Sequence, residues 1–202
     1  MDGWRPVART LGNGNEGGGG GGGTDDEGII RRAQLGEPLP NGWSLYPHQV
    51  EAVEHIVRRK RVILAFDMGL GKTLIALVAA RAFQRERRCR VLVICPISVA
   101  AGWEKEAAAV GVVISIHSWG KVPEAEQELR KGQDFMLVCD EAHYMQNINA
   151  KRTKAALALA DAASVLVLAT GTPAKNAKPS NVFPLLVRVP SHRQPLYWGR
   201  QA

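Results

Sequence analysis

Residues 67–73 read Asp67-Met68-Gly69-Leu70-Gly71-Lys72-Thr73, and this stretch decides the fold of the 202-residue chain. An apolar run precedes it at residues 62–66 and a helical pattern follows at residues 74–80. This order predicts a strand, a phosphate-binding loop and a helix, because glycines let successive backbone N–H groups close around an anion. Lys72 is expected to reach the β and γ phosphates and the Thr73 hydroxyl to ligate Mg²⁺, so ATP is the first ligand to expect.

The match to a phosphate-binding loop is incomplete, because Phe66 stands where the general pattern has Gly or Ala. The core Gly-x-Gly-Lys-Thr is intact. The alternative is an ordinary glycine-rich turn that caps a helix. A second motif, with a carboxylate at the end of another strand, would favour the interpretation of residues 67–73 as a phosphate-binding loop.

That second motif is Asp140-Glu141-Ala142-His143, which directly follows the apolar run 135–139. In a parallel sheet, ligands lie beyond the carboxyl ends of the strands, so Asp140 is expected beside the loop that holds Lys72. Asp140 would then hold Mg²⁺, directly or through water, and Glu141 would polarise a water for in-line attack on the γ phosphate. The alternative is a hydrated acidic helix cap.

A third polar element, Thr170-Gly171-Thr172-Pro173, ends the buried run 165–169. Its hydroxyl groups are placed to hydrogen-bond His143 or the γ phosphate, and so to sense whether nucleotide is bound. Taken alone, the element would be only a turn before a helix.

Strand and helix patterns alternate along the chain. Strands are expected near residues 62–66, 91–95, 112–116, 135–139 and 164–169, and helices near 47–60, 72–87, 98–109, 123–131 and 150–161. The strands are continuously apolar, which is typical of a sheet covered on both faces. The fold class is therefore α/β, a single three-layer domain with a parallel sheet.

The order of motifs resembles a known family, the first motor lobe of the switch/sucrose-nonfermenting (Snf-two) ATPases of helicase superfamily two. The resemblance covers residues 43–190 and is nearest to the small bacterial-type and annealing-helicase-like branches. It rests on the three motifs above together with Leu45-Tyr46-Pro47-His48-Gln49, Cys95-Pro96-Ile97-Ser98, Trp103-Glu104-Lys105-Glu106 and Asn176. It implies a RecA-like P-loop NTPase lobe of a DNA-dependent ATPase or translocase, helicase-like and of the chromatin-remodelling or DNA-repair type.

The resemblance also assigns roles to residues. Gln49 matches the glutamine that reads adenine. The coupling residues, which sense whether nucleotide is bound, are matched by His143, Thr170, Gly171 and Thr172. Pro96, Ser98 and Trp103 match a block that faces the nucleic-acid backbone, although Ser98 could equally be a helix N-cap. Ser118 and Trp119 fit the next such block, with Trp119 equally open to a place in the core. The implied ATP site comprises Gln49, Asp67, Met68, Gly69, Leu70, Gly71, Lys72 and Thr73.

Four positions depart from the family pattern. Phe66 replaces an acidic residue, Asp67 a common Glu, Gln146 a Lys and Lys175 a Gln. None of these changes removes a catalytic group, so the catalytic assignments remain Lys72, Asp140 and Glu141. The departures bear on the subfamily and on the strength of contacts with DNA.

The domain boundaries follow from composition. Residues 1–40 include an unbroken glycine run at 17–23 and are expected to be a disordered tail. Residues 41–190 form the expected ATP-binding lobe, residues 191–202 an irregular end, and a second RecA-like lobe with its completing arginines is absent. Because such arginines contribute on the order of a thousandfold to turnover, little hydrolysis is expected from this polypeptide alone. A second motor lobe, in trans or in an uncut chain, would complete it.

Two other classes of protein remain as alternatives. A small phosphate-loop kinase or GTPase would need an acceptor pocket or a guanine-reading motif, and neither is visible. A non-catalytic module that binds nucleotide or a protein partner is the more serious rival. DNA-stimulated phosphate release, with Lys72→Ala as the control, discriminates between a motor lobe and such a module.

The charge balance favours a polyanionic partner. The formal net charge is +7, and the first 40 residues hold 4 Arg against 6 acidic residues, so residues 41–202 carry +9. The basic clusters, Arg58-Arg59-Lys60-Arg61 and the set Arg81, Arg85, Arg87, Arg88 and Arg90, follow helices, where cations complement the helix dipole. The resemblance implies double-stranded DNA as the partner, bound weakly by the chain alone through its phosphates, and a positive field assists binding to any polyanion.

Cysteine content and hydropathy point to an intracellular protein. Cys89, Cys95 and Cys139 show no metal-binding spacing and no even count, so reduced thiols are expected. No segment is long and apolar enough to span a membrane, and the N-terminus lacks a secretory signal. A nuclear or cytoplasmic location is expected, with an organelle not excluded.

Overall fold

A computed structural model of the chain describes residues 26–87, 89–128, 134–171 and 196–198. Their strands form one six-stranded sheet in the order β3-β2-β4-β5-β1-β6, and every pairing is parallel. The strands are β1 Arg61–Ala65, β2 Arg90–Cys95, β3 Ser115–Ser118, β4 Phe135–Asp140, β5 Val165–Ala169 and β6 Leu196–Trp198. The α-helices are α1 Asp26–Ala33, α2 Pro47–Arg59, α3 Lys72–Glu86, α4 Ala100–Val110, α5 Val122–Glu128 and α6 Lys151–Ala162, and the 3₁₀ helices are η1 Ile97–Val99 and η2 Ala142–Met145.

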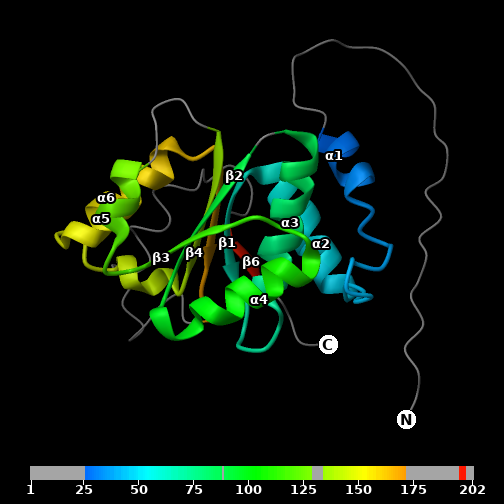
Figure 1. The fold of residues 1–202 in the computed structure, drawn as a ribbon, viewed down its shortest axis with the longest axis horizontal. Coiled ribbons are helices and arrows are strands. Elements are labelled where there is room, and N and C mark those ends of the chain that lie inside the picture. Colours follow the sequence, from blue (N-terminus) through cyan, green and yellow to red (C-terminus); the bar gives the residue numbers. More distant parts are fainter. Residues whose placement is uncertain (1–25, 88, 129–133, 172–195, 199–202) are drawn as a thin grey trace.

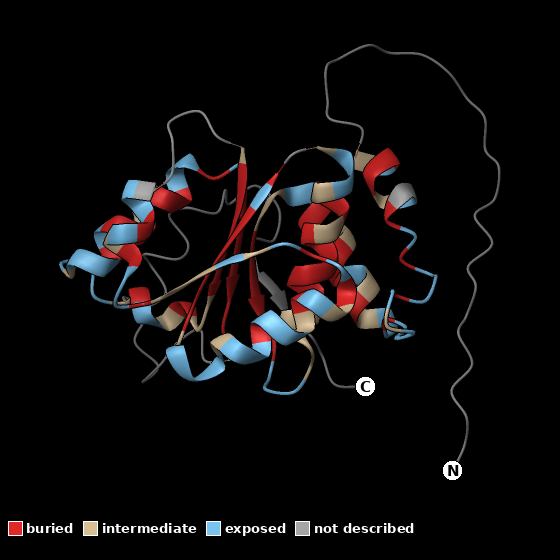
Figure 2. Cartoon of the chain, in the orientation of Figure 1, coloured by how far each residue is buried: buried red, intermediate tan, exposed pale blue. Residues whose placement is uncertain are grey.

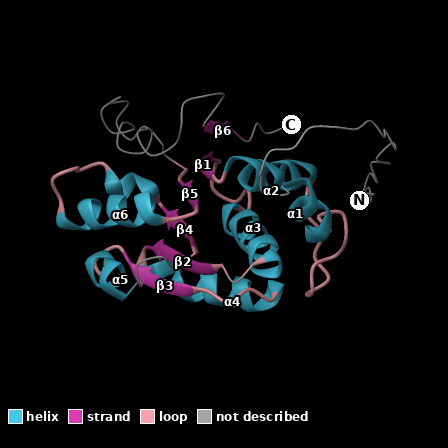
Figure 3. Ribbon diagram, turned by 90° about the horizontal axis from the view of Figure 1, so that it is seen from above, coloured by secondary structure: helices cyan, strands magenta, loops and turns pink. Residues whose placement is uncertain are grey.

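The helices cover both faces of the sheet, as the apolar strands predict. Helices α1 to α4 lie on one face and α5, η2 and α6 on the other (Figures 1 and 3). Successive strand residues point to opposite faces, so Val62 and Leu64 belong to the first core and Ile63 to the second. Figure 2 shows the central strands buried along most of their length, and only the end residues Arg61, Arg90 and Asp140 are less covered. The three-layer α/β prediction is confirmed.

One strand lies later in the chain than predicted. The apolar run near 112–116 suggested a strand there, but β3 begins at Ser115. Val112 donates its N–H to Ala107 at the end of α4, and the side-chain amide of Gln84 makes two hydrogen bonds with the backbone of Val113, at 2.7 and 3.2 Å. These backbone groups are therefore already paired, and the strand starts only beyond them.

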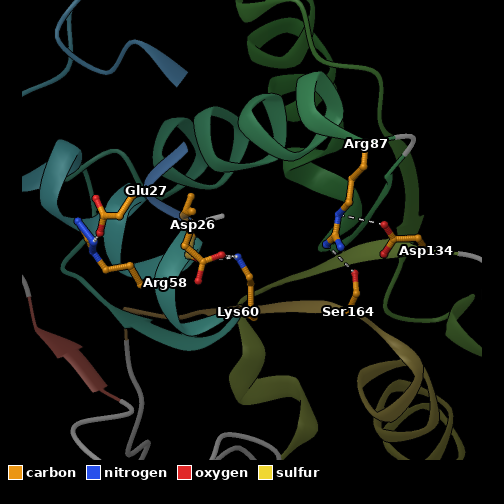
Figure 4. A network of polar contacts seen from close by, with 8 residues as sticks. Asp26, Glu27, Arg58, Lys60, Arg87, Asp134 and Ser164 are labelled. Atoms are coloured by element: carbon orange, nitrogen blue, oxygen red, sulfur yellow. Dashed lines mark hydrogen bonds and ion pairs between the residues drawn. The ribbon is translucent and has the colours of Figure 1, made fainter. Parts of the chain in front are cut away.

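The fold begins before residue 41, which corrects the expectation of a disordered tail over residues 1–40. Helix α1 and the turn after it bury Ile29, Leu35 and Leu39 in the core shared with α2 and α3. Asp26 is 2.6 Å from Nζ of Lys60, and Glu27 pairs with Arg58 (Figure 4). The apolar positions are too few to show a period in the sequence, and only packing against α2 and α3 makes them a core. Residues 1–25 lie outside the described residues.

The C-terminal region also differs from the expected irregular end. Residues Leu196–Trp198 pair in parallel with β1, with Leu196 opposite Ile63. A strand of three residues is too short to give a recognisable pattern, and its pairing depends on the free edge that β1 offers.

Several cations of the basic clusters have local structural partners. Arg61 donates to the carbonyls of Ala160 and Ala163 at the end of α6, at 2.8 and 3.0 Å. Arg87 contacts Asp134 at 3.0 Å and Ser164 at 3.2 Å, and so ties the end of α3 to the starts of β4 and β5 (Figure 4). These contacts agree with a structural role at helix ends. Among the described residues, no helix is long and apolar enough to cross a membrane.

Candidate ATP and nucleic-acid site

The loop after β1 has the backbone of an anion cradle. Gly69 and Gly71 have φ of +86° and +76°, a left-handed conformation that residues with a Cβ rarely adopt. Gly71 is the N-cap of α3, so the free N–H groups of the first helical turn face the loop. This is the local geometry that binds phosphate at a helix N-terminus.

Lys72 places its ammonium inside this loop. Its Nζ donates to the carbonyl oxygens of Phe66 at 2.9 Å and of Asp67 at 3.0 Å. The positive charge of Lys72 and the positive end of the α3 dipole therefore lie at the same loop, which favours an anion there. The residues predicted to cradle phosphate are brought together.

Gln49 lies against the loop although it comes from α2. Its Oε1 accepts the N–H of Tyr46 at 3.0 Å, and its Nε2 lies 3.5 Å from the carbonyl of Leu70. A Cβ on Gly71 would come 2.3 Å from that same Nε2. These contacts explain why a polar side chain is buried at the start of an amphipathic helix, and they place Gln49 at the predicted nucleotide site.

Phe66, the departure from the phosphate-loop pattern, is accommodated in the core. Its side chain is 1 % exposed, and its ring lies 6.1 Å from the ring of His48, which in turn stacks on Tyr46 at 5.9 Å. The aromatic ring therefore packs beneath the start of α2, and its carbonyl remains available to Lys72.

The acidic motif begins at the end of β4, where Asp140 accepts three hydrogen bonds. Its Oδ1 accepts the N–H of Glu141 at 3.0 Å, its Oδ2 the indole N–H of Trp103 at 3.0 Å, and its backbone oxygen the indole N–H of Trp119 at 2.9 Å. Glu141 has φ of +52°, a rarely populated conformation for a residue with a side chain. Strain of this kind is a feature of functional sites.

The structure decides the positions of the two tryptophans, Trp103 and Trp119. Trp103, expected to face nucleic acid, is 2 % exposed and turned toward Asp140, which corrects that expectation. Trp119 is 4 % exposed, so the core alternative holds. The sequence carries no signal for either hydrogen bond, because both indoles are far from Asp140 along the chain.

His143 contacts the expected catalytic carboxylate. Its Nδ1 lies 3.0 Å from Oε2 of Glu141, a contact that becomes an ion pair when the imidazole is protonated. The His143 ring stacks on Tyr144 at 4.9 Å, and Tyr144 stacks on Trp119 at 5.7 Å. The acidic motif is thereby joined to the turn after β3.

The third motif lies between the other two. Strand β5 separates β1 from β4, and Asp140 pairs with Ala169 in the register. Thr170 is fully buried and donates its N–H to Leu64 at 3.1 Å. A Cβ on Gly171 would lie 3.9 Å from Nζ of Lys72, so this residue contacts the phosphate loop. Thr172 lies outside the described residues.

Comparison with known proteins assigns the family. The model of the SNF2-related domain matches residues 48–110 and 104–191. The chain belongs to the SNF2-related domain family. Its fold is also that of solved relatives: the SWI2/SNF2 ATPase core of Sulfolobus solfataricus, solved in complex with dsDNA, superposes with a TM-score of 0.66 at 24 % identity, over 79 % of this chain and 38 % of that one.

Curated relatives with this domain are longer. The chain is 29 % identical over 69 % of its length to a SWI/SNF-related matrix-associated actin-dependent regulator of chromatin subfamily A-like protein 1 homolog of Caenorhabditis elegans, and 30 % identical over 72 % to the Bos taurus protein of the same name. It is 28 % identical over 69 % to the Mus musculus DNA annealing helicase and endonuclease ZRANB3. It spans 23 %, 17 % and 15 % of these three relatives.

In this SNF2-related domain, the residues predicted to face DNA lie at the same edge of the sheet as the phosphate loop. Pro96 and Ser118 are half-buried and Ser98 is exposed. The residue at the N-cap of α4 is Val99, so Ser98 does not cap that helix. The neighbouring Ile97 is 79 % exposed. The segments after β2 and β3 therefore present a surface beside the site.

The chemistry of the site fits ATP with Mg²⁺. The described residues contain no group of three or more His, Cys, Asp or Glu side chains able to hold a metal ion. Mg²⁺ does not require such a group, because it keeps several waters and binds through one or two carboxylates together with substrate phosphates. Asp140 and the hydroxyl of Thr73, the residue after Lys72 in α3, are the side chains of the motifs that would hold it.

The cysteines of this domain have no nucleophilic or metal-binding role in the site. All three are free and buried. Burial, with the charges of Asp140 and Glu104, raises the pKa of Cys95 to about 11, and burial likewise raises the pKa of Cys139. Neutral thiols are poor nucleophiles and poor metal ligands, so these side chains serve packing.

Proposed function

We propose that this chain is the ATP-binding lobe of a DNA-dependent ATPase that translocates on double-stranded DNA in chromatin remodelling or DNA repair. The observation that carries this proposal is the order of strands β4, β5 and β1. It delivers the acidic motif, Thr170-Gly171 and the Lys72 loop to one edge of the sheet. Family membership and the names of the relatives support the same conclusion.

Each side chain then has a defined task. The ammonium of Lys72 and the N–H groups at the start of α3 bind the β and γ phosphates, and Gln49 contacts the adenine. Asp140 and Thr73 hold Mg²⁺, which neutralises charge on the phosphates when bound. Glu141 orients and polarises the attacking water, and His143 holds the Glu141 carboxylate through the 3.0 Å contact.

The partner is the phosphate backbone of double-stranded DNA, contacted at Pro96, Ser98 and Ser118. The solved neighbour from Sulfolobus solfataricus is in complex with dsDNA, which supports DNA as the partner. A second motor lobe, in trans or in a longer chain, supplies the groups that complete hydrolysis, so turnover by the 202 residues alone is low. A nuclear or cytoplasmic location fits such a partner.

Nucleotide binding is the first test. Titration of a fluorescent ATP analogue with the wild-type chain should give saturable, Mg²⁺-dependent binding that Lys72→Ala abolishes. Lys121→Ala is the matched control, because Lys121 is a surface lysine whose side chain is 67 % exposed. Equal binding by Lys72→Ala and wild type would overturn the assignment of the loop.

Hydrolysis is the second test, made in a two-lobe protein that contains these residues. Glu141→Gln should keep nucleotide affinity and lose DNA-stimulated phosphate release. Unchanged release would remove Glu141 from its role. Nucleotide binding with no DNA-stimulated release from the wild-type two-lobe protein would instead favour a non-catalytic binding module.

A further inference from the structure

Asp140 is held by two tryptophans from outside its own motif. Trp103 is the fourth residue of α4, and Trp119 follows β3. Trp103 donates to the carboxylate, whereas Trp119 donates to the backbone carbonyl of the same residue. Strand β2 lies between β3 and β4, so Trp119 reaches past the end of β2, whereas Trp103 comes from the helix that follows β2, the direct neighbour of β4.

The Trp103 bond restrains the carboxylate together with the N–H of the next residue. Oδ1 is occupied by the N–H of Glu141, and Oδ2 by the indole. An indole N–H is a donor only, so Oδ2 of Asp140 acts as the acceptor of this bond. With a side chain 2 % exposed, Trp103 is shielded from competing water. Two donors on two oxygens fix the rotation of the carboxylate while leaving lone pairs for a cation.

The position of Trp103 also connects two parts of the domain. Helix α4 follows η1 directly, and η1 carries the exposed residues Ile97 and Val99 beside Ser98. A displacement of this segment moves the start of α4 and with it the indole. The carboxylate of Asp140 is thus tied to the surface predicted to face DNA.

We propose that Trp103 is a positioning residue for Asp140, one that orients the carboxylate toward Mg²⁺ and makes α4 part of the metal site. The proposal deepens the proposed function and rests on it, because it assumes that Asp140 meets Mg²⁺ together with ATP. Groups that hydrogen-bond to a metal ligand typically contribute 10- to 100-fold to metal affinity.

The test measures how much Mg²⁺ tightens binding of a fluorescent ATP analogue, by titration with saturating Mg²⁺ and with chelator. In Trp103→Phe, affinity without Mg²⁺ should equal that of wild type, and the gain from Mg²⁺ should fall about tenfold or more. Trp43→Phe, a change at an exposed indole, should leave both unchanged. In Asp140→Asn, adding Trp103→Phe should cause no further loss, because the two residues act through one bond.

A second variant serves as the control for a loss of folding. Trp103→3-benzothienylalanine replaces the indole N–H by sulfur and keeps the fused ring, so packing and the unfolding midpoint should be retained while the gain from Mg²⁺ falls. A full gain in this variant would overturn the role of Trp103 and leave the proposed function intact. No Mg²⁺-dependent gain in the wild type, or an equal gain in Lys72→Ala, would instead overturn the proposed function itself.

Discussion

A Cβ on Gly71 would lie 2.3 Å from Nε2 of Gln49, so a side chain at residue 71 would displace the end of the Gln49 side chain. Gly71 also has φ of +76°. A residue with a Cβ is disfavoured in this conformation by about 1–2 kcal/mol, and the close approach adds to that. The requirement for glycine therefore comes from both the backbone and the neighbour.

Gly71→Ala should lower the free energy of unfolding by at least about 1 kcal/mol and abolish nucleotide binding, because Gln49 must move. Gly102→Ala is the matched control, since nothing lies within 4 Å of a Cβ at that position in α4. It should be neutral or stabilise by up to about 1 kcal/mol. Urea unfolding and nucleotide titration of both variants check the pair, and equal behaviour would contradict the crowding at Gly71.

Gln49→Glu separates the structural and binding roles of that side chain. Oε1 is retained and still accepts the N–H of Tyr46, while the Nε2 donor is lost. ATP affinity should fall about tenfold, and the preference for ATP over GTP should shrink. Gln84→Glu is the control, because it makes the same change near the C-terminal end of α3, away from the phosphate loop. Unaltered selectivity in Gln49→Glu would remove Gln49 from adenine recognition.

Ile29→Ala tests whether residues 26–40 belong to the fold. Ile29 is 5 % exposed in α1, so truncation should destabilise by about 2–4 kcal/mol. Glu27→Gln removes the ion pair with Arg58, whose side chains are 67 % and 42 % exposed, and should change stability by less than about 1 kcal/mol. Urea unfolding measures both. A neutral Ile29→Ala would mean that α1 does not stabilise the domain.

The buried thiols predict a fall in stability at alkaline pH. Burial raises the pKa of Cys89 and of Cys95 from 9.0 to about 11. Between these values the unfolded chain loses protons that the folded chain keeps, so the free energy of unfolding decreases as pH rises from 9 to 11, by up to about 1 kcal/mol per pH unit for each thiol. Below pH 9 this contribution is fully present.

Urea unfolding of wild type and of Cys95→Ala at several pH values checks this dependence. The variant has lost one thiol, so its stability should fall less steeply between pH 9 and 11. Identical slopes would show that Cys95 ionises alike in both states.

Parts of the fold could be predicted because their signals are local. The continuous apolar runs before Asp67 and Asp140 correctly indicated buried parallel strands. Helix α1 was not predicted, and strand β3 was predicted to start too early, because both depend on contacts with distant residues. Ile29 becomes a core residue only when α2 and α3 pack on it, and residues 112–114 are kept out of the sheet by the amide of Gln84, a distant side chain.

The central strands, the helices between them and the motifs that follow the strands could be recognised in the sequence, because hydrophobic period, turn glycines and helix starts are properties of neighbouring residues. Only the tertiary structure decided which side chains meet. The pairing of Trp103 with Asp140, of Gln49 with Gly71 and of His143 with Glu141 depends on strand order and on backbone conformation at single residues. Such contacts join segments that the chain separates, and they form only when the buried sheet fixes where its carboxyl ends lie.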